Sequence, residues 1–260
     1  MSALLAATGL THAYRQARVL SDVSLSVNAG EFVAIIGANG SGKSTLLRIL
    51  GRLLRPNAGS VLIDGVPLAT IAPRAFARRV AFVPQGPVAP GDVVVRELVR
   101  RGRYPHRSRF GGSTEHDRAA IETAIARVGL ADLADRPMGM LSGGERQRAW
   151  IALALAQEPA LVLLDEPTTF LDIAHQLELL TLLTRLNREE GLTVVTVLHD
   201  IAQAAQHAGR IIGLRDGRVV ADGPPQVVVT VDGLRALFGV SLRVMPDPDT
   251  GLPLVLPHAG

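Results

Sequence analysis

The segment 37–45 constrains the fold and function of this chain more than any other. It reads Gly-Ala-Asn-Gly-Ser-Gly-Lys-Ser-Thr and fits the pattern G-x-x-x-x-G-K-[ST]. The largely apolar run 31–36 before it predicts a buried strand, and the run 46–50 after it predicts the start of a helix. Between a strand and a helix this pattern forms a loop whose backbone N–H groups bind phosphate, whereas a chance glycine-rich turn would lack these flanks. We therefore expect nucleotide phosphates to be bound by Gly37, Ala38, Asn39, Gly40, Ser41, Gly42, Lys43, Ser44 and Thr45.

Lysine usage singles out one position in that loop. The chain holds 27 lysine and arginine residues, and Lys43 is the only lysine. An ammonium group is a compact point charge, whereas a guanidinium group is a planar fork. A general preference for arginine explains the other basic positions but leaves Lys43 as an exception. We expect Lys43 to contact the β- and γ-phosphates and the Ser44 hydroxyl to bind Mg²⁺.

Composition limits the classes of protein that remain. With 260 residues the chain is one large domain or a core with an inserted subdomain. The absence of cysteine excludes disulfides and thiolate metal sites, and the seven histidines show no spacing typical of a metal site. A net charge of +3 is weak support for nucleic-acid binding. No apolar run approaches the roughly 18 residues of a membrane span, and residues 2–7 lack the basic start of a signal peptide, so we expect a soluble cytoplasmic protein.

Strands and helices are expected to alternate along the chain. Short apolar runs bounded by turn residues predict strands at 4–14, 19–27, 60–63, 80–83, 161–164, 193–198, 210–215 and 218–222. Apolar residues at helical spacing predict a helix at 114–128, where Thr114 and Asp117 form a capping pattern, and another around 179–186. This alternation indicates an α/β core, and the segment 87–156 is expected to be a helical insertion.

Two carboxylates follow the apolar run 161–164. Asp165 and Glu166 stand where a fully buried parallel strand would end, and open α/β sheets bind ligands at the carboxyl ends of their strands. A strand that ends in acidic surface residues has the same pattern, but the neighbouring phosphate loop favours a role in chemistry. We expect Asp165 to hold Mg²⁺ and Glu166 to activate a water molecule as a general base.

The segment 141–148, Leu-Ser-Gly-Gly-Glu-Arg-Gln-Arg, resembles the signature of ABC transporters, which is usually written L-S-G-G-Q. It lies between the phosphate loop and the acidic strand end, as it does in that family. A helix that starts with a serine and two glycines offers N–H groups to a second anion. An ordinary serine-capped helix would explain Ser142 but not the rest of the segment.

The resemblance to ABC ATPases covers the chain from about residue 4 to its end and implies a fold. That fold is an α/β P-loop NTPase (RecA-like) core with an antiparallel β subdomain and an inserted α-helical subdomain. The chain 1–260 would be a single ABC ATPase domain. Its nucleotide-binding core would occupy 1–86 and 157–260, and the helical signature subdomain would occupy 87–156.

The same resemblance assigns roles to residues that are ambiguous when taken singly. Tyr14 would stack on adenine, and Gln85 would contact Mg²⁺ and couple to membrane subunits. Asp172 would lie in the loop that crosses a dimer, and His199 would contact the γ-phosphate. Two departures from the family pattern, Glu145 for glutamine and Ala38 for proline, put nothing central in doubt.

Together these roles form three sets of site residues. The catalytic set comprises Lys43, Glu166 and His199. The Mg²⁺ ligands comprise Ser44, Gln85 and Asp165. The residues expected to bind the ATP of a partner chain are Ser142, Gly143, Gly144 and Glu145.

Members of this family enclose two ATP molecules between two cassettes, each ATP lying between the phosphate loop of one and the signature of the other. Because this chain has one of each, a complete site needs a second copy of the chain or a paralogue, and our hypothesis is a homodimer. The dimer would dock on two transmembrane permease subunits at the cytoplasmic face of the plasma membrane, and a periplasmic substrate-binding protein would deliver the cargo.

Three segments, 102–106, 167–176 and 247–253, resemble the ATPase subunits of bacterial importers for iron chelates such as siderophores, for haem and for cobalamin. Two alternatives stay open: the ATPase subunit of an exporter, and a nucleic-acid-related ABC ATPase that grips phosphates with an arginine cluster. The second needs two cassettes or a long coiled coil, and no sustained heptads occur here. We expect a solvated basic face and no nucleic-acid partner for that cluster, which comprises Arg96, Arg100, Arg101, Arg103, Arg107 and Arg109.

Overall fold

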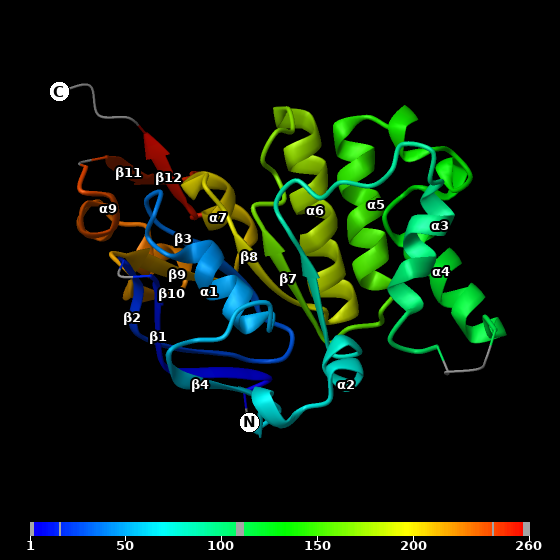
Figure 1. Cartoon of the computed structure of the whole chain (residues 1–260). Helices are drawn as coiled ribbons and strands as arrows, with labels where there is room; N and C mark the ends of the chain where they lie inside the picture. Colours follow the sequence, from blue (N-terminus) through cyan, green and yellow to red (C-terminus); the bar gives the residue numbers. More distant parts are fainter. Residues whose placement is uncertain (1–2, 16, 108–111, 241, 257–260) are drawn as a thin grey trace.

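The computed structural model describes residues 3–15, 17–107, 112–240 and 242–256, and Figure 1 shows helices and a smaller sheet arranged around a central sheet. The strands are β1 (Leu5–Tyr14), β2 (Ala17–Val27), β3 (Phe32–Ile36), β4 (Ala58–Ile63), β5 (Val66–Pro67), β6 (Val80–Val83), β7 (Leu161–Asp165), β8 (Thr193–Val197), β9 (Arg210–Arg215), β10 (Arg218–Gly223), β11 (Arg243–Pro246) and β12 (Pro253–Leu256). The α-helices are α1 (Lys43–Leu50), α2 (Pro73–Ala77), α3 (Val95–Arg100), α4 (Glu115–Arg127), α5 (Gly143–Leu155), α6 (Ile173–Glu190), α7 (Ile201–His207), α8 (Pro225–Val228) and α9 (Val231–Phe238).

The central sheet has the strand order β10-β9-β3-β8-β7-β6. Strands β9, β3, β8, β7 and β6 run parallel to one another, and β10 pairs antiparallel with β9 as the predicted hairpin. Every residue of β3, β7 and β8 is buried, as expected for strands covered on both faces. In β3, Phe32 and Ile36 pack into the core on one face, and Val33 and Ile35 pack into the core on the other.

The second sheet, in the order β2-β1-β4-β5, is antiparallel throughout. Asp64 and Gly65, both at positive φ, form the tight turn that joins β4 to β5. Apolar residues of this sheet pack in one cluster with α1 and with one face of the central sheet; Leu10, Leu46 and Val195 represent the three layers. The phosphate-loop helix therefore lies between the two sheets.

Helices α3, α4 and α5 pack on one another at the side of the molecule away from the antiparallel sheet (Figure 1). Helix α4 begins at the predicted capping box between Thr114 and Asp117. Its predicted apolar face is buried at Ile121, Ile125 and Val128. These side chains share one apolar cluster with α6 and with the other face of the central sheet, because α5 also packs on β6 and α6. The boundaries of the helical subdomain at 87 and 156 stay a prediction.

The fold class predicted from the sequence is confirmed by the parallel core, the antiparallel sheet and the helices inserted between β6 and β7. After the β9–β10 hairpin, α8 and α9 lead into the hairpin β11–β12, and β12 lies against α7. Among the residues that the structure describes, no helix is long and apolar enough to cross a membrane.

The strand order brings the predicted site residues to one edge of the central sheet. The phosphate loop follows β3, His199 follows β8, Glu166 follows β7, and Gln85 follows β6. These four strands are consecutive neighbours and parallel, so their carboxyl ends lie side by side. A ligand-binding edge of this kind is common in open α/β sheets.

Candidate active site

The phosphate loop curls around the amino group of Lys43. Lys43 Nζ donates hydrogen bonds to the carbonyl oxygens of Gly37 and Ala38, both at 2.9 Å. A Cβ added at Gly37 would lie 2.1 Å from the Leu214 carbonyl oxygen, so this position accepts no side chain. The Ser41 hydroxyl is buried and has no hydrogen-bond partner among the described residues. A loop with a buried cation and an unpaired buried donor fits a polyphosphate anion.

The first carboxylate of the strand end, Asp165, faces this loop. Ser44 Oγ donates to Asp165 Oδ1 at 2.8 Å, and Arg48 on α1 approaches Asp165 Oδ2 at 3.8 Å. Asp165 Oδ2 is buried and accepts no hydrogen bond from any residue that the structure describes. Hydroxyl and carboxylate oxygens are ligands that Mg²⁺ prefers, and Mg²⁺ is commonly held by one carboxylate together with substrate phosphates. No cluster of three or more His, Cys, Asp or Glu residues suited to a metal occurs in the part of the chain that the structure describes.

Burial shifts the pKa values of Lys43 and Asp165 in opposite directions. It lowers the pKa of Lys43, and the carboxylates of Glu166 and Asp165 counteract this effect in part. It raises the pKa of Asp165, and the hydrogen bond from Ser44 and the charge of Arg48 counteract that effect in part. Both ions therefore lie where water screens them poorly, so charges brought next to them interact strongly.

The second carboxylate, Glu166, is the point at which three other side chains meet. Gln85 Nε2 donates to Glu166 Oε2 at 2.6 Å, and Thr169 Oγ1 donates to the same oxygen at 3.3 Å. His199 Nε2 lies 2.6 Å from Glu166 Oε1. The Glu166 side chain is 11% exposed, so its carboxylate stays within reach of a water molecule. This geometry suits a general base held in place by its neighbours.

Tyr14, the residue predicted to stack on adenine, ends β1 and is 45% exposed. Its ring meets the buried ring of His12 edge to face, with 4.8 Å between the ring centroids. Edge-to-face contacts of this kind fix the orientation of a ring. Tyr14 is therefore held by His12 and still accessible to a ligand.

The segment predicted to bind the partner's ATP starts α5. Ser142 caps the helix, its hydroxyl accepts from Glu145 N, and Glu145 Oε2 accepts from Ser142 N at 2.7 Å. A Cβ added at Gly144 would lie 2.2 Å from the His175 ring, so α5 here lies directly on α6. Asp172, the predicted dimer-loop residue, caps α6 and pairs with His175 at 2.8 Å.

Comparison with known proteins agrees with this geometry. The family model for the ABC transporter matches residues 20–169. The chain belongs to the ABC transporter family. It is 47% identical to the ferric enterobactin transport ATP-binding protein of Escherichia coli (strain K12), an alignment that covers 95% of this chain and 92% of that protein. It is 43% identical to the iron(3+)-hydroxamate import ATP-binding protein of Bacillus subtilis (strain 168), over 92% of this chain and 89% of that protein.

Solved structures of ABC proteins share the fold. A protein described as a metal-chelate type ABC transporter, in an inward-facing conformation, superposes with a TM-score of 0.86 at 30% identity and covers 99% of this chain and 98% of that chain. A dimeric cassette in a post-hydrolysis state with ADP and Pi superposes with a TM-score of 0.73 at 33% identity, over 85% of this chain and 98% of that chain. This ABC cassette is accordingly an ATP hydrolase, while the roles of its individual site residues stay predictions.

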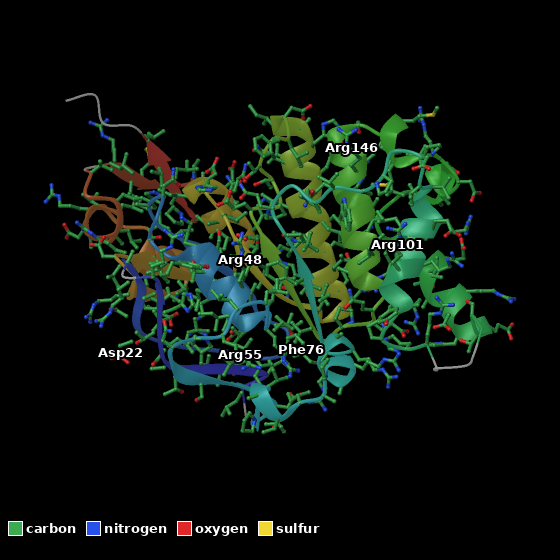
Figure 2. The ribbon with its side chains drawn as sticks, viewed as in Figure 1. Asp22, Arg48, Arg55, Phe76, Arg101 and Arg146 are labelled. Atoms are coloured by element: carbon green, nitrogen blue, oxygen red, sulfur yellow. The ribbon has the colours of Figure 1, made fainter. Side chains whose placement is uncertain are left out.

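The structure brings most of the predicted site residues of this ABC cassette together, but it does not bring all of them. The phosphate loop, Asp165, Glu166, Gln85 and His199 form one cluster. The signature segment lies elsewhere: Figure 2 shows Arg146, at the start of α5, well apart from Arg48 on α1. The phosphate-loop cluster and the signature segment therefore lie at separate places in one chain.

The expectation of a solvated basic face at the arginine cluster is wrong for Arg103. Its side chain is 1% exposed and pairs with Asp117 at 2.8 Å and with Glu158 at 2.6 Å. Arg96 and Arg100 also pair with carboxylates, but Arg100, Arg101 and Arg107 are exposed, as expected for a solvated face. Arg109 lies outside the described residues. Within the described cluster, only Arg103 forms a buried ion pair that links parts of the helical segment.

Sequence reasoning missed three residues that touch the site. Thr169 donates to Glu166, Arg48 approaches Asp165, and His175 links the signature helix to the dimer loop. A signal existed for one of them, because Asp172 and His175 have the i, i+3 spacing of a helix cap and its partner. Thr169 and Arg48 carry no such local signal.

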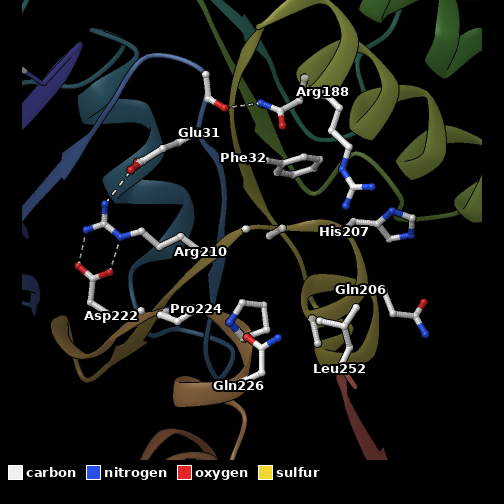
Figure 3. A pocket seen from close by; sticks show the side chains of 17 residues that line it. Glu31, Phe32, Arg188, Gln206, His207, Arg210, Asp222, Pro224, Gln226 and Leu252 are labelled. Atoms are coloured by element: carbon white, nitrogen blue, oxygen red, sulfur yellow. Dashed lines mark hydrogen bonds and ion pairs between the residues drawn. The ribbon is translucent and has the colours of Figure 1, made fainter. Parts of the chain in front are cut away.

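A cavity of about 820 Å³ lies at the opposite end of the central sheet (Figure 3). It adjoins the starts of β3 and β9, where Arg210 pairs with Asp222 at 2.6 Å and with Glu31 at 3.3 Å. None of the predicted site residues is among the described residues that line it. The size of a cavity is therefore a poor guide to the site in this cassette.

Proposed function

We propose that this chain is the ATP-hydrolysing subunit of a bacterial importer for an iron chelate, such as a siderophore or haem. The observation that supports ATP hydrolysis most directly is the carboxylate pair Asp165 and Glu166 beside the phosphate loop. Support for an iron chelate comes from two relatives whose names refer to ferric enterobactin and to iron(3+)-hydroxamate. Both relatives align with nearly the whole of this chain.

The residues of the cluster divide the work of hydrolysis. Lys43, Ser41 and the loop N–H groups would bind the phosphates of ATP and balance their charge, and Tyr14 would hold the adenine. Ser44, Asp165 and Gln85 would bind Mg²⁺, which supplies further charge neutralisation at the phosphates. Glu166 would orient the attacking water and accept its proton, and His199 would contact the γ-phosphate. Positioning and charge neutralisation carry most of the catalysis in phosphoryl transfer.

A second copy of the chain would complete the site. Ser142, Gly143, Gly144 and Glu145 lie away from the phosphate loop of their own chain, and the exposed side chains of Phe170 and Ile173 flank Asp172. Exposed apolar groups next to a helix start that can bind an anion suit a contact that forms around ATP. The dimer would dock on two transmembrane permease subunits at the cytoplasmic face of the membrane and would receive cargo through a periplasmic binding protein.

Uptake by intact cells tests this function. Cells in which Glu166→Gln replaces the native residue should lose uptake of a radiolabelled iron siderophore or of haem. Their uptake of an unrelated amino acid should not change. If the variant cells accumulate every iron chelate as fast as the parent cells, while the purified variant has lost ATP hydrolysis, the importer proposal is wrong although the ATPase assignment holds.

A further inference from the structure

The turn between β9 and β10 links two parts of the molecule that are far apart in sequence. The Gly217 N–H donates to the carbonyl oxygen of Ser41 in the phosphate loop at 3.2 Å. The Gly217 carbonyl oxygen accepts from the Ser21 N–H of β2 at 2.8 Å. One residue thus uses both of its backbone groups to join the phosphate loop to the antiparallel sheet.

The same place is closed to any side chain. Gly217 has φ +72°, and a Cβ added there would lie 2.4 Å from the Val19 carbonyl oxygen. From the other side, a Cβ added at Gly42 of the phosphate loop would lie 2.8 Å from the same oxygen and 2.7 Å from Leu20 Cδ2. Gly42 and Gly217 therefore both pack closely against Val19 and Leu20 of β2, because only glycine allows backbones to approach so closely.

That stretch of β2 is paired with the strand that carries Tyr14. In the register of the pair, Tyr14 lies opposite Ala17 and His12 lies opposite Leu20. A shift of residues 19–21 relative to the phosphate loop would therefore move Tyr14 relative to Lys43. The contacts of Gly217 therefore affect the distance between Tyr14, at the base of a bound nucleotide, and Lys43, at its phosphates.

We infer that Gly217 is a positioning residue that holds the base-binding end of the site at a fixed distance from the phosphate loop. This inference rests on the proposed roles of Tyr14 and the phosphate loop. A nucleotide gains affinity from its base and its phosphates together only when both sites are already aligned, because aligning them on binding costs conformational entropy. Gly217 acts through the backbone of β2 and makes no contact with the base or the reacting atoms.

The test compares two glycines that share a conformation and differ in surroundings. Gly217→Ala places a methyl group against Val19, whereas Gly191→Ala changes a residue at φ +69° with no atom within 4 Å of the added Cβ. Both variants carry the backbone strain of alanine in the left-handed region. Titration calorimetry with MgATP and with magnesium tripolyphosphate, which lacks the base, measures the two ends of the site separately.

Gly217→Ala should weaken MgATP binding by about tenfold and leave tripolyphosphate binding within about twofold, while Gly191→Ala changes neither. Retained tripolyphosphate binding also reports a folded phosphate loop. Val19→Ala, which adds no bulk, should shift the same ratio in the same direction by a smaller factor. Equal losses for both ligands, or no loss for MgATP, would overturn the inference.

A fourth variant separates this inference from the proposed function. Tyr14→Ala should remove most of the preference for MgATP over tripolyphosphate, and adding Gly217→Ala to it should then have little further effect on that preference. If Tyr14→Ala leaves the preference intact, the base-stacking role fails and the coupling fails with it. If Tyr14→Ala removes the preference but Gly217→Ala does not alter it, the function stands and Gly217 is not a positioning residue.

Discussion

Glu166 holds a conformation that non-glycine residues adopt rarely. Its φ is +52°, which typically costs about 1–3 kcal/mol and persists where the surroundings hold the backbone in place. The turn takes Glu166 out of the path of β7, and its carboxylate meets Gln85, which follows β6, and His199, which follows β8. Strain at this residue is consistent with a fixed general base.

Replacing Glu166 with glutamine should separate binding from turnover. Glu166→Gln keeps the size of the side chain and its capacity to accept a hydrogen bond from Gln85, but the amide cannot take a proton from water. We expect MgATP affinity to stay within about twofold and kcat to fall by about 10²–10⁴, measured by calorimetry and by phosphate release. Glu178→Gln, in an exposed ion pair on α6, is the matched control and should leave kcat unchanged. Turnover of Glu166→Gln near that of the parent would remove Glu166 from the catalytic set.

The single lysine allows a direct chemical test of the phosphate loop. Amine reagents attack the neutral amine, and burial lowers the pKa of Lys43, so its labelling should rise at lower pH than that of an ordinary lysine. MgATP should suppress the labelling of Lys43 and leave that of the N-terminal amine unchanged, as read by mass spectrometry. Equal labelling of Lys43 with and without MgATP would argue against its contact with phosphate.

At the scale of elements, the start of α5 explains why glutamate can replace glutamine in the signature. The carboxylate of Glu145 closes a capping box with Ser142, and the hydrogen bond from the Ser142 N–H lowers the pKa of Glu145. A glutamine side chain can accept the same hydrogen bond. The departure from the family pattern is thus conservative in its local structure.

Glu145→Ala should therefore destabilise the fold by about 1 kcal/mol at pH 7, while Glu145→Gln should stay within about 0.5 kcal/mol of the parent. Because the pKa of Glu145 is lowered in the folded chain, its stabilisation is present above its ordinary pKa and is lost as the pH falls through the folded-state value. Urea unfolding at neutral and at acid pH measures both effects. Equal losses for alanine and glutamine would show that the capping box contributes nothing.

The ion pair of Arg103 should matter far more to stability than the exposed pairs beside it. Arg103 also donates to the Ala156 carbonyl oxygen at 2.7 Å. The hydrogen bond from the Thr114 N–H, together with the hydrogen bond and charge of Arg103, lowers the pKa of its partner Asp117 to about 2. Arg103→Ala removes the cation beside the buried Asp117 carboxylate, which keeps only its hydrogen bonds from Thr114, and should cost about 3–5 kcal/mol in urea unfolding at pH 7. Arg100→Ala removes an exposed pair with Glu97 and should cost less than about 1 kcal/mol. Similar losses of unfolding free energy for the two variants would mean that burial does not make the Arg103 ion pair more stabilising than the exposed one.

The Asp117 contribution has a defined pH window. Because its folded-state pKa of about 2 lies below the ordinary value of 3.8, the stabilisation is complete above the ordinary value and is lost as the pH falls through about 2. Acid unfolding of Asp117→Asn should lack this part of the transition, whereas the parent should show it.

The helix caps and the buried ion pair of Arg103 show which features a local sequence pattern can predict and which it cannot. The capping boxes at Thr114 and Ser142 could be predicted because the cap and its partner are three residues apart in the sequence. The burial of Arg103 could not be predicted, because its partners Asp117 and Glu158 lie 14 and 55 residues away. Among neighbouring arginines it had the pattern of a solvated face, and the tertiary contact overrode that pattern.

At the scale of the whole molecule, the sequence predicts the layers but not their order. The fully apolar run 161–164 identifies β7 as a buried parallel strand, and the runs at β3 and β8 predict two further strands. Nothing in them specifies the order β10-β9-β3-β8-β7-β6, since strand partners are chosen through long-range packing. The contacts of Gly217 could not be predicted from the sequence for the same reason. Gly217 is hydrogen-bonded to Ser21 of β2 and to Ser41 of the phosphate loop, which lie about 180–200 residues before it in the sequence.

The central claim is that one chain holds two halves of different nucleotide sites and that a second copy completes each of them. Sedimentation of the Glu166→Gln variant at high protein concentration, with and without MgATP, tests it most directly, since the variant should bind MgATP without consuming it. We expect a monomer without nucleotide and a dimer with one MgATP bound per chain. A chain that stays monomeric while MgATP occupies its phosphate loop would contradict the account.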